Sequence, residues 1–185
     1  MRNIHFYIIS LFMIFYSCSG NLQRERKDGS IENLIRNAIS EIENRNIEQQ
    51  IINSDAFWGT DSTKHTTLSE LTLSPKLFFY FTSNTCTPCI DQSVEIIKDV
   101  FPNYKKNENI IFVSPDYPLR YSNNCYGKKL LKLENNNFGL SINDDNQPPY
   151  FIVVKNMKVK SIHVVNKMDF DRTREYLSLV SKMIP

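Results

Sequence analysis

The feature that most constrains this 185-residue sequence is a short, continuously apolar run at residues 77–81. The run reads Leu-Phe-Phe-Tyr-Phe and directly follows the turn signal Ser74-Pro75 and Lys76. Because polar and apolar residues do not alternate in it, the run predicts a strand that is buried on both faces. Such a strand needs a covering layer on each side, which favours an α/β domain.

Short elements bounded by turn signals follow this run. Further apolar runs predict three strands, at residues 109–114, 150–154 and 159–165. Apolar residues at three- and four-residue spacing predict three helices, at residues 90–101, near 126–135 and at 170–184. The predicted order over residues 68–185 is β-α-β-α-β-β-α, and this length suffices for one hydrophobic core.

The N-terminus has the layout of an export signal. Arg2 precedes an apolar run at residues 6–16, and Ser17-Cys18-Ser19-Gly20 follow it. This run is too short to span a membrane as a helix, so we expect residues 1–17 to be a signal peptide. A cysteine among small residues resembles the bacterial lipoprotein signal, which implies a lipid on Cys18. The alternatives are an ordinary cleaved signal or an uncleaved anchor, each with an incidental Cys18.

Three segments are expected between the signal and the α/β domain. Residues 18–29 are polar and unpatterned, which predicts a tether. Within residues 30–67, apolar periodicity after the N-cap Ser30 predicts a helix over about 31–50, packed on its own domain rather than on a partner. The turn-rich residues 53–67 predict a linker or an irregular lead-in. The frequent Asn, Ile and Lys favour a Bacteroidota source, and the absence of an acidic run after Cys18 favours a periplasm-facing anchor.

The motif that carries chemistry is Cys86-Thr87-Pro88-Cys89, which directly follows the first predicted strand and begins a helix. Two thiols at this spacing can close a disulfide across a helix start. The positive end of the helix dipole favours the thiolate of Cys86, which is the attacking species in disulfide exchange. Cys89, one turn further along, is then the resolving thiol. Pro88 fits the first turn because its missing N–H costs nothing there.

A C-x-x-C motif alone also serves zinc and iron-sulfur sites, so its context matters. Here it lies between a strand and a helix of a β-α-β unit, as a redox motif requires. Pro148-Pro149 also precedes the strand at residues 150–154, and an X-Pro bond there is a candidate for the cis form.

These residues resemble the thioredoxin fold. The resemblance covers about residues 68–185 and rests on Thr-Cys-Thr-Pro-Cys at 85–89 and Gln-Pro-Pro-Tyr-Phe-Ile-Val-Val at 147–154. It predicts a three-layer α/β sandwich with an additional N-terminal helix, most similar to the membrane-tethered TlpA-like thioredoxins. It implies that Cys86 attacks a substrate disulfide, that Cys89 resolves the mixed disulfide, and that Pro149 is a cis-proline beside the motif. Thr87, Pro88, Pro148 and Pro149 would contact the substrate.

The chain departs from the family pattern at several positions. The usual tryptophan before the first cysteine is Thr85, and the helix proline after the second is Val94. The buried acid of the preceding strand is Tyr80, which could not deprotonate Cys89 at neutral pH. Pro148 has no N–H to donate to a substrate chain. Asp91 and Glu95 are candidates for the missing proton transfer, although solvated helix-face acids are the commoner case.

The remaining features exclude other functions. With 22 basic and 20 acidic side chains, the formal charge of +2 gives no basic excess for nucleic-acid binding. Cys125 is a leftover thiol, structural or redox-active. His65 and His163 lack metal-ligand spacing, and we expect His163 to be a satisfied or exposed strand histidine. We therefore expect no metal and no cofactor, and a monomer.

The leading hypothesis is a lipid-anchored periplasmic thiol-disulfide oxidoreductase that uses Cys86 and Cys89. Its partners would be envelope proteins with thiols or disulfides and an upstream electron donor. The alternative is a thioredoxin-fold binding lipoprotein whose Cys86–Cys89 disulfide is only structural. Peroxidase chemistry at Cys86 is a minor third hypothesis, because no Thr/Arg signature for peroxide binding is visible.

Overall fold

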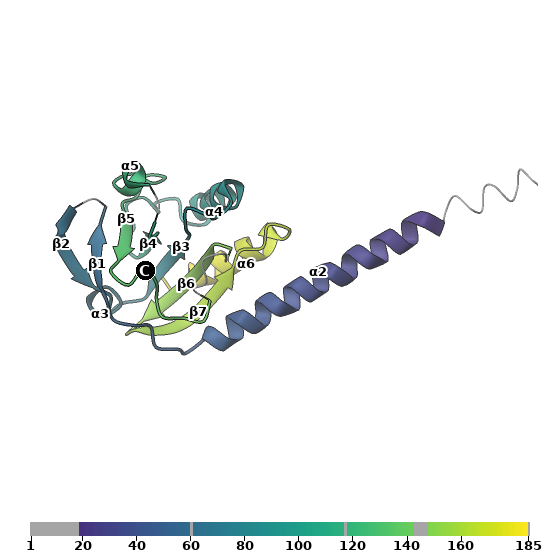
Figure 1. Ribbon diagram of the computed structural model, residues 1–185, viewed down its shortest axis with the longest axis horizontal. Coiled ribbons are helices and arrows are strands. Elements are labelled where there is room, and N and C mark those ends of the chain that lie inside the picture. Colours follow the sequence, from purple (N-terminus) through teal and green to yellow (C-terminus); the bar gives the residue numbers. More distant parts are fainter. Residues whose placement is uncertain (1–18, 60, 117, 143–147, 185) are drawn as a thin grey trace, which may run out of the picture. The chain divides into compact units, whose positions relative to one another are not determined.

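The computed structural model describes residues 19–59, 61–116, 118–142 and 148–184 of the chain (Figure 1). The chain divides into two units, residues 1–41 and residues 42–185. The predicted signal peptide and the lipidation site Cys18 lie outside the described residues.

The described part of the first unit is helical. Helix α2 spans Ser19–Asn46, so it begins well before the predicted residues 31–50 and includes residues 19–29, whose role as a tether stays a prediction. Gln, Arg, Glu and Lys are good helix formers even without apolar periodicity, which explains why a pattern search misses this segment. Among the described residues, no helix is both long enough and apolar enough to cross a membrane.

The second unit is built on a seven-stranded mixed sheet. Its strands, in chain order, are β1 Asp55–Trp58, β2 Asp61–Thr67, β3 Lys76–Tyr80, β4 Ile110–Val113, β5 Leu130–Leu133, β6 Tyr150–Lys155 and β7 Lys158–Val164. The order across the sheet is β2-β1-β5-β4-β3-β6-β7. Strands β3, β4 and β5 are parallel, and all other neighbours are antiparallel. Strand β3 is therefore an interior strand with a neighbour on each edge, as its apolar run predicts.

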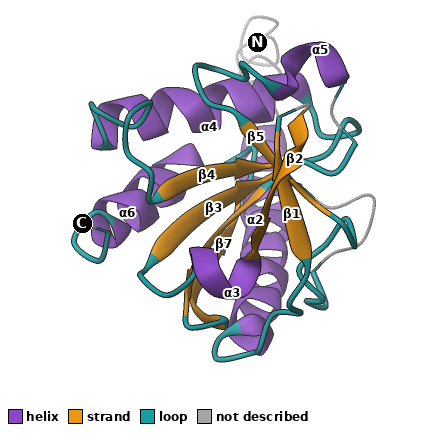
Figure 2. Cartoon of the chain, turned by 90° about the vertical axis from the view of Figure 1, so that its left-hand side faces the viewer, coloured by secondary structure: helices purple, strands orange, loops and turns teal. Residues whose placement is uncertain are grey.

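The two long helices of this unit, α4 (Thr87–Val100) and α6 (Phe170–Val180), lie on the same face of the sheet (Figure 2). They pack on Leu77 and Phe79 of β3, on Phe81 just after the strand, and on Phe151 of β6. On the opposite face, Phe138 packs edge-on against Phe78 with ring centroids 5.3 Å apart. Short helices α3 (Leu68–Leu71) and α5 (Leu119–Ser122) lie in connections. The buried β3 is thus covered on both sides.

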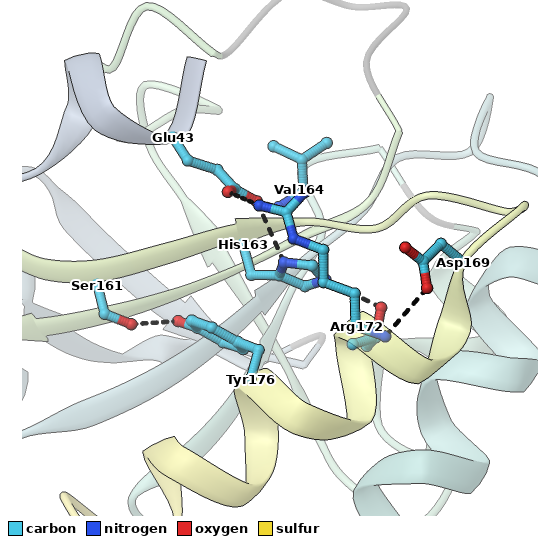
Figure 3. A network of polar contacts seen from close by, with 8 residues as sticks. Glu43, Ser161, His163, Val164, Asp169, Arg172 and Tyr176 are labelled. Carbon is cyan, nitrogen blue, oxygen red and sulfur yellow. Dashed lines mark hydrogen bonds and ion pairs between the residues drawn. The ribbon is translucent and has the colours of Figure 1, made fainter. Parts of the chain in front are cut away.

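Within the second unit, a buried polar network ties the last turn of α2 to β7 and α6 (Figure 3). The Glu43 carboxylate accepts hydrogen bonds from the Val164 amide at 2.9 Å and from the Arg172 guanidinium at 2.5 Å, and it lies 3.1 Å from His163 Nδ1. His163 Nε2 lies 2.9 Å from the hydroxyl of Thr173. The expectation of a satisfied strand histidine is confirmed, since both ring nitrogens of His163 have partners.

Two secondary-structure predictions are wrong. Residues 126–135, predicted as a helix, contain the strand β5. A short apolar run such as Leu130–Leu133 cannot be assigned by periodicity alone, and here the free edges of β4 and β1 supply its hydrogen-bond partners. Tyr126 and Gly127 both have positive φ, which is incompatible with a helix start.

The predicted irregular lead-in at residues 53–67 is instead the β1–β2 hairpin. Strand β2 is an edge strand of polar and threonine residues, so it carries no apolar alternation for a sequence pattern to detect. The other predicted strands and helices of this unit are confirmed to within a few residues of their expected ends, except that the C-terminal helix ends at Val180.

Phe138 offers a test of how the second face of the sheet is covered. We expect Phe138→Ala to lower the free energy of unfolding by about 3–5 kcal/mol, because it removes a fully buried aromatic ring that packs on Phe78 of β3. Leu73→Ala is the matched control, since the Leu73 side chain is 71% exposed. Chemical denaturation measures both, and equal effects would contradict this packing.

Candidate active site

Cys86 and Cys89 form a disulfide at the carboxyl end of β3, with their Cα atoms 5.3 Å apart. Cys86 is the N-cap residue of α4, and Thr87 and Pro88 form the start of its first turn. Cys86, Thr87 and Pro88 are exposed, whereas Cys89 is only 8% exposed. The first cysteine of the pair is thus accessible from outside, whereas the second is buried.

The first turn of α4 directs its backbone amides at Cys86. The amide of Cys89 donates to Cys86 Sγ at 3.2 Å, and the Cys86 carbonyl accepts from Cys89 and Ile90. Free amides and the positive end of a helix dipole stabilise negative charge. When the pair is reduced, this arrangement favours the thiolate of Cys86.

The loop between β3 and the motif is held by its own threonines. The Thr82 amide donates to the Thr85 hydroxyl at 3.0 Å, and the Thr85 amide donates to the Thr82 carbonyl at 3.1 Å. Thr85, which stands where the family has tryptophan, is buried. Its role here is to close the turn that leads into Cys86.

A second contact ties this loop to the loop after β4. Asp116 accepts from the Ser83 amide at 2.8 Å and from the Ser83 hydroxyl at 2.5 Å. Sequence reasoning missed this pair. The available signal was that both residues follow the carboxyl ends of adjacent parallel strands, where side chains from distant segments meet.

Neither Tyr80 nor the two candidate acids, Asp91 and Glu95, forms a buried carboxylate beside Cys89. Tyr80 lies on the sheet face opposite α4, where its ring stacks on Tyr150 and its hydroxyl donates to the Asn136 carbonyl at 3.0 Å. Asp91 accepts from the Tyr126 hydroxyl, and Glu95 pairs with Lys98. Both acids are exposed, and their role as proton acceptors stays a prediction. Val94 is fully buried in the helix face that packs on the sheet.

The two prolines lie at the same edge of the sheet as the disulfide. Tyr150 pairs with Tyr80, so Pro148 and Pro149 lie beside the segment that follows β3. Pro148 is exposed, and the carbonyl of buried Pro149 accepts from the Val165 amide at 2.9 Å. The expected cis-proline is wrong: no peptide bond between described residues is cis, so the Pro148–Pro149 bond is trans. The trans form is intrinsically favoured by about 0.5–1 kcal/mol.

The leftover thiol and the histidines do not join this site. Cys125 is 3% exposed, and burial raises the pKa of its thiol to about 11, which supports a sequestered, structural cysteine. His65 packs edge-on against Phe57. Across the described residues, no group of three or more His, Cys, Asp or Glu side chains is arranged to hold a metal ion.

Comparison with known proteins rests on structure alone. The chain matches no protein-family model and no curated protein. It is similar to the solution structure of a candidate protein disulfide isomerase from Bacteroides thetaiotaomicron, with a TM-score of 0.51 and 17% identity over 75% of this chain and 89% of that one. It also matches an uncharacterised thioredoxin-like protein from Porphyromonas gingivalis, with a TM-score of 0.48 and 14% identity over 74% and 95% of the two chains.

The chain has a thioredoxin-like fold. The predicted fold class, an α/β thioredoxin-like sandwich with an additional N-terminal helix, is therefore confirmed. Within this fold the Cys86–Cys89 disulfide lies at the start of α4, the helix that follows β3. Contact of Thr87, Pro88, Pro148 and Pro149 with a substrate stays a prediction.

Cys86 and Cys125 should differ sharply in reactivity. After reduction we expect iodoacetamide at pH 8 to modify Cys86 rapidly and Cys125 very slowly. Burial keeps the Cys125 thiol protonated at this pH, and a protonated thiol is a poor nucleophile. Mass spectrometry of timed samples measures both rates. Comparable rates in the folded protein would contradict the structure, and a denatured sample gives the unprotected rate of Cys125.

Proposed function

We propose that this protein is a thiol-disulfide oxidoreductase whose reactive pair is Cys86 and Cys89. The observation that carries the proposal is the asymmetry of the disulfide: an exposed sulfur at a helix N-terminus is backed by a buried one. This is the arrangement needed for attack from outside and resolution from within. The description of the similar B. thetaiotaomicron structure as a candidate protein disulfide isomerase agrees with it.

The reaction follows from the geometry. In the reduced protein, the Cys86 thiolate attacks one sulfur of a substrate disulfide, forms a mixed disulfide and releases the other substrate sulfur as a thiolate. Cys89, once deprotonated, attacks Cys86 Sγ and releases the second substrate sulfur. The Cys86–Cys89 disulfide forms, the substrate gains two electrons, and two protons from the pair go to the substrate thiolates through solvent. An upstream dithiol donor then returns two electrons to the pair.

We propose envelope proteins as substrates and a lipid on Cys18 as the membrane anchor, with the thioredoxin-like unit facing the periplasm. The export signal at residues 1–17 and the cysteine that follows it support this location. A reactive disulfide also fits a compartment in which disulfides persist. Neither feature fixes whether the pair reduces substrates or exchanges their disulfides.

The alternative function is a binding lipoprotein with a structural disulfide. The replacement of the usual acid by Tyr80, which points away from α4, favours it, because no buried carboxylate is then supplied by β3 to accept the Cys89 proton. In that case the disulfide would stabilise the start of α4 and would not turn over.

Trapping distinguishes the two functions. In a Cys89→Ser variant, Cys86 can attack a substrate but the mixed disulfide is not resolved, so we expect covalent complexes on non-reducing gels. Cys86→Ser should give none and should lose insulin-reduction activity at least a hundredfold. Cys125→Ser is the matched control and should behave like the wild type. Folded Cys89→Ser protein that traps no substrate, together with no activity in the wild type, would support the structural disulfide instead.

A further inference from the structure

A cavity of about 530 Å³ lies at the end of the sheet opposite the disulfide. Lys76 and Ile110, which begin the parallel strands β3 and β4, line it, as do Gly127 and Lys128 just before β5. Trp58 forms part of its wall from β1. Since Cys86 follows the carboxyl end of β3, this cavity is not the place where a substrate disulfide would meet the redox pair.

The cavity is strongly cationic although the whole chain is nearly neutral. Its lining contains five lysines, namely Lys76, Lys105, Lys106, Lys128 and Lys129, and one acid, Glu108. Lys105, Lys106 and Lys129 are exposed, and none of them forms an ion pair with another described residue. Lysines gathered around a concave surface focus a positive potential into it.

Lys128 is more buried than these three lysines, and its positive charge also has no paired carboxylate among the described residues. Its ammonium donates to the carbonyls of Tyr104 at 2.9 Å and Asn107 at 2.8 Å, which uses two of its three hydrogens. In the described part of the chain no carboxylate lies within ion-pair distance of it. Burial lowers the pKa of Lys128 to about 8, and the charge of Glu108 opposes that shift. A bound anion would supply the missing countercharge.

The turn at Tyr126 and Gly127 places Lys105 close to Lys128. Cys125 and Lys128 exchange backbone hydrogen bonds of 2.7 and 3.0 Å around a two-residue turn in which Tyr126 and Gly127 have φ of 52° and 89°. A Cβ at Gly127 would lie 2.8 Å from Cε of Lys105. Glycine therefore lets the stem of Lys105 lie across the turn that carries Lys128.

We propose that this cavity binds a phosphate-bearing anion through Lys105, Lys128 and Lys129, with Trp58 against the apolar part of the ligand. Its volume is in the range of small-molecule sites and exceeds that of a single phosphate ion. Lysine ammonium groups bind phosphate oxygens as point charges. The anion could be a soluble phosphate ester or the headgroup of an anionic lipid, which share this chemistry.

Pyrophosphate is the probe, and Trp58, the only tryptophan of the chain, is the reporter. Titration of the full chain at pH 7 and constant low ionic strength should give a saturable change in Trp58 fluorescence, and calorimetry should give the same affinity. We expect Lys128→Met and Lys105→Gln each to weaken binding about tenfold, as loss of a charged hydrogen bond would. Lys182→Gln removes an exposed lysine outside the cavity and should leave binding unchanged.

A folding check and a lipid comparison decide how the binding data are interpreted. Near-ultraviolet circular dichroism checks that the Lys128→Met protein is folded. If it does not fold, Lys105→Gln carries the test, because this substitution changes only an exposed side chain. Vesicles containing phosphatidic acid, compared with phosphatidylcholine alone, identify the source: binding that Lys105→Gln weakens assigns a lipid headgroup, and binding to pyrophosphate alone assigns a soluble ligand. No saturable binding in either arm, or equal binding by all variants, would overturn the proposal.

Discussion

The structure depends on the burial of β3 on both of its faces. Leu77, Phe78 and Phe79 are fully buried, between a parallel neighbour on one side and an antiparallel neighbour on the other. Hydrogen bonds and packing therefore fix the direction and the register of this strand in the sheet. The chain leaves it at a defined point, turns through Thr82 and Thr85, and enters α4 at Cys86. The position of the Cys86 sulfur thus follows from the burial of an apolar strand.

Sequence reasoning succeeded where one physical signal dominates. Continuous apolar runs predicted the central strands, and two cysteines at a strand-to-helix junction predicted the disulfide. It failed for β5 and the β1–β2 hairpin, whose residues become strands because neighbouring edges offer them hydrogen bonds, a fact that local periodicity does not contain. It also failed for Pro149, where a resemblance suggested a cis bond. The link between Ser83 and Asp116 joins residues 33 apart and needed the sheet topology.

The two ends of the sheet have different chemical character. The carboxyl ends of β3 and β4 carry the disulfide and the Ser83–Asp116 link, whereas the amino ends are surrounded by lysines. The formal charge of +2 argued against nucleic-acid binding, and averaging over the chain hid this local concentration of charge. Net charge constrains long-range attraction, while a concave cluster acts at short range, so the two observations agree.

The turn at Tyr126 and Gly127 has a consequence for how this sequence can vary. Its first residue touches α4 through Asp91 and also accepts a hydrogen bond from Tyr104, while its second lies under the stem of Lys105. Position 127 thus has a left-handed backbone that glycine adopts without strain, and a side chain there would also have to displace the flexible stem of Lys105. Relatives that keep both the turn and the lysine above it should keep this glycine even where the surrounding loop has diverged. A side chain at this position would mark a chain in which the lysine cluster has been rebuilt.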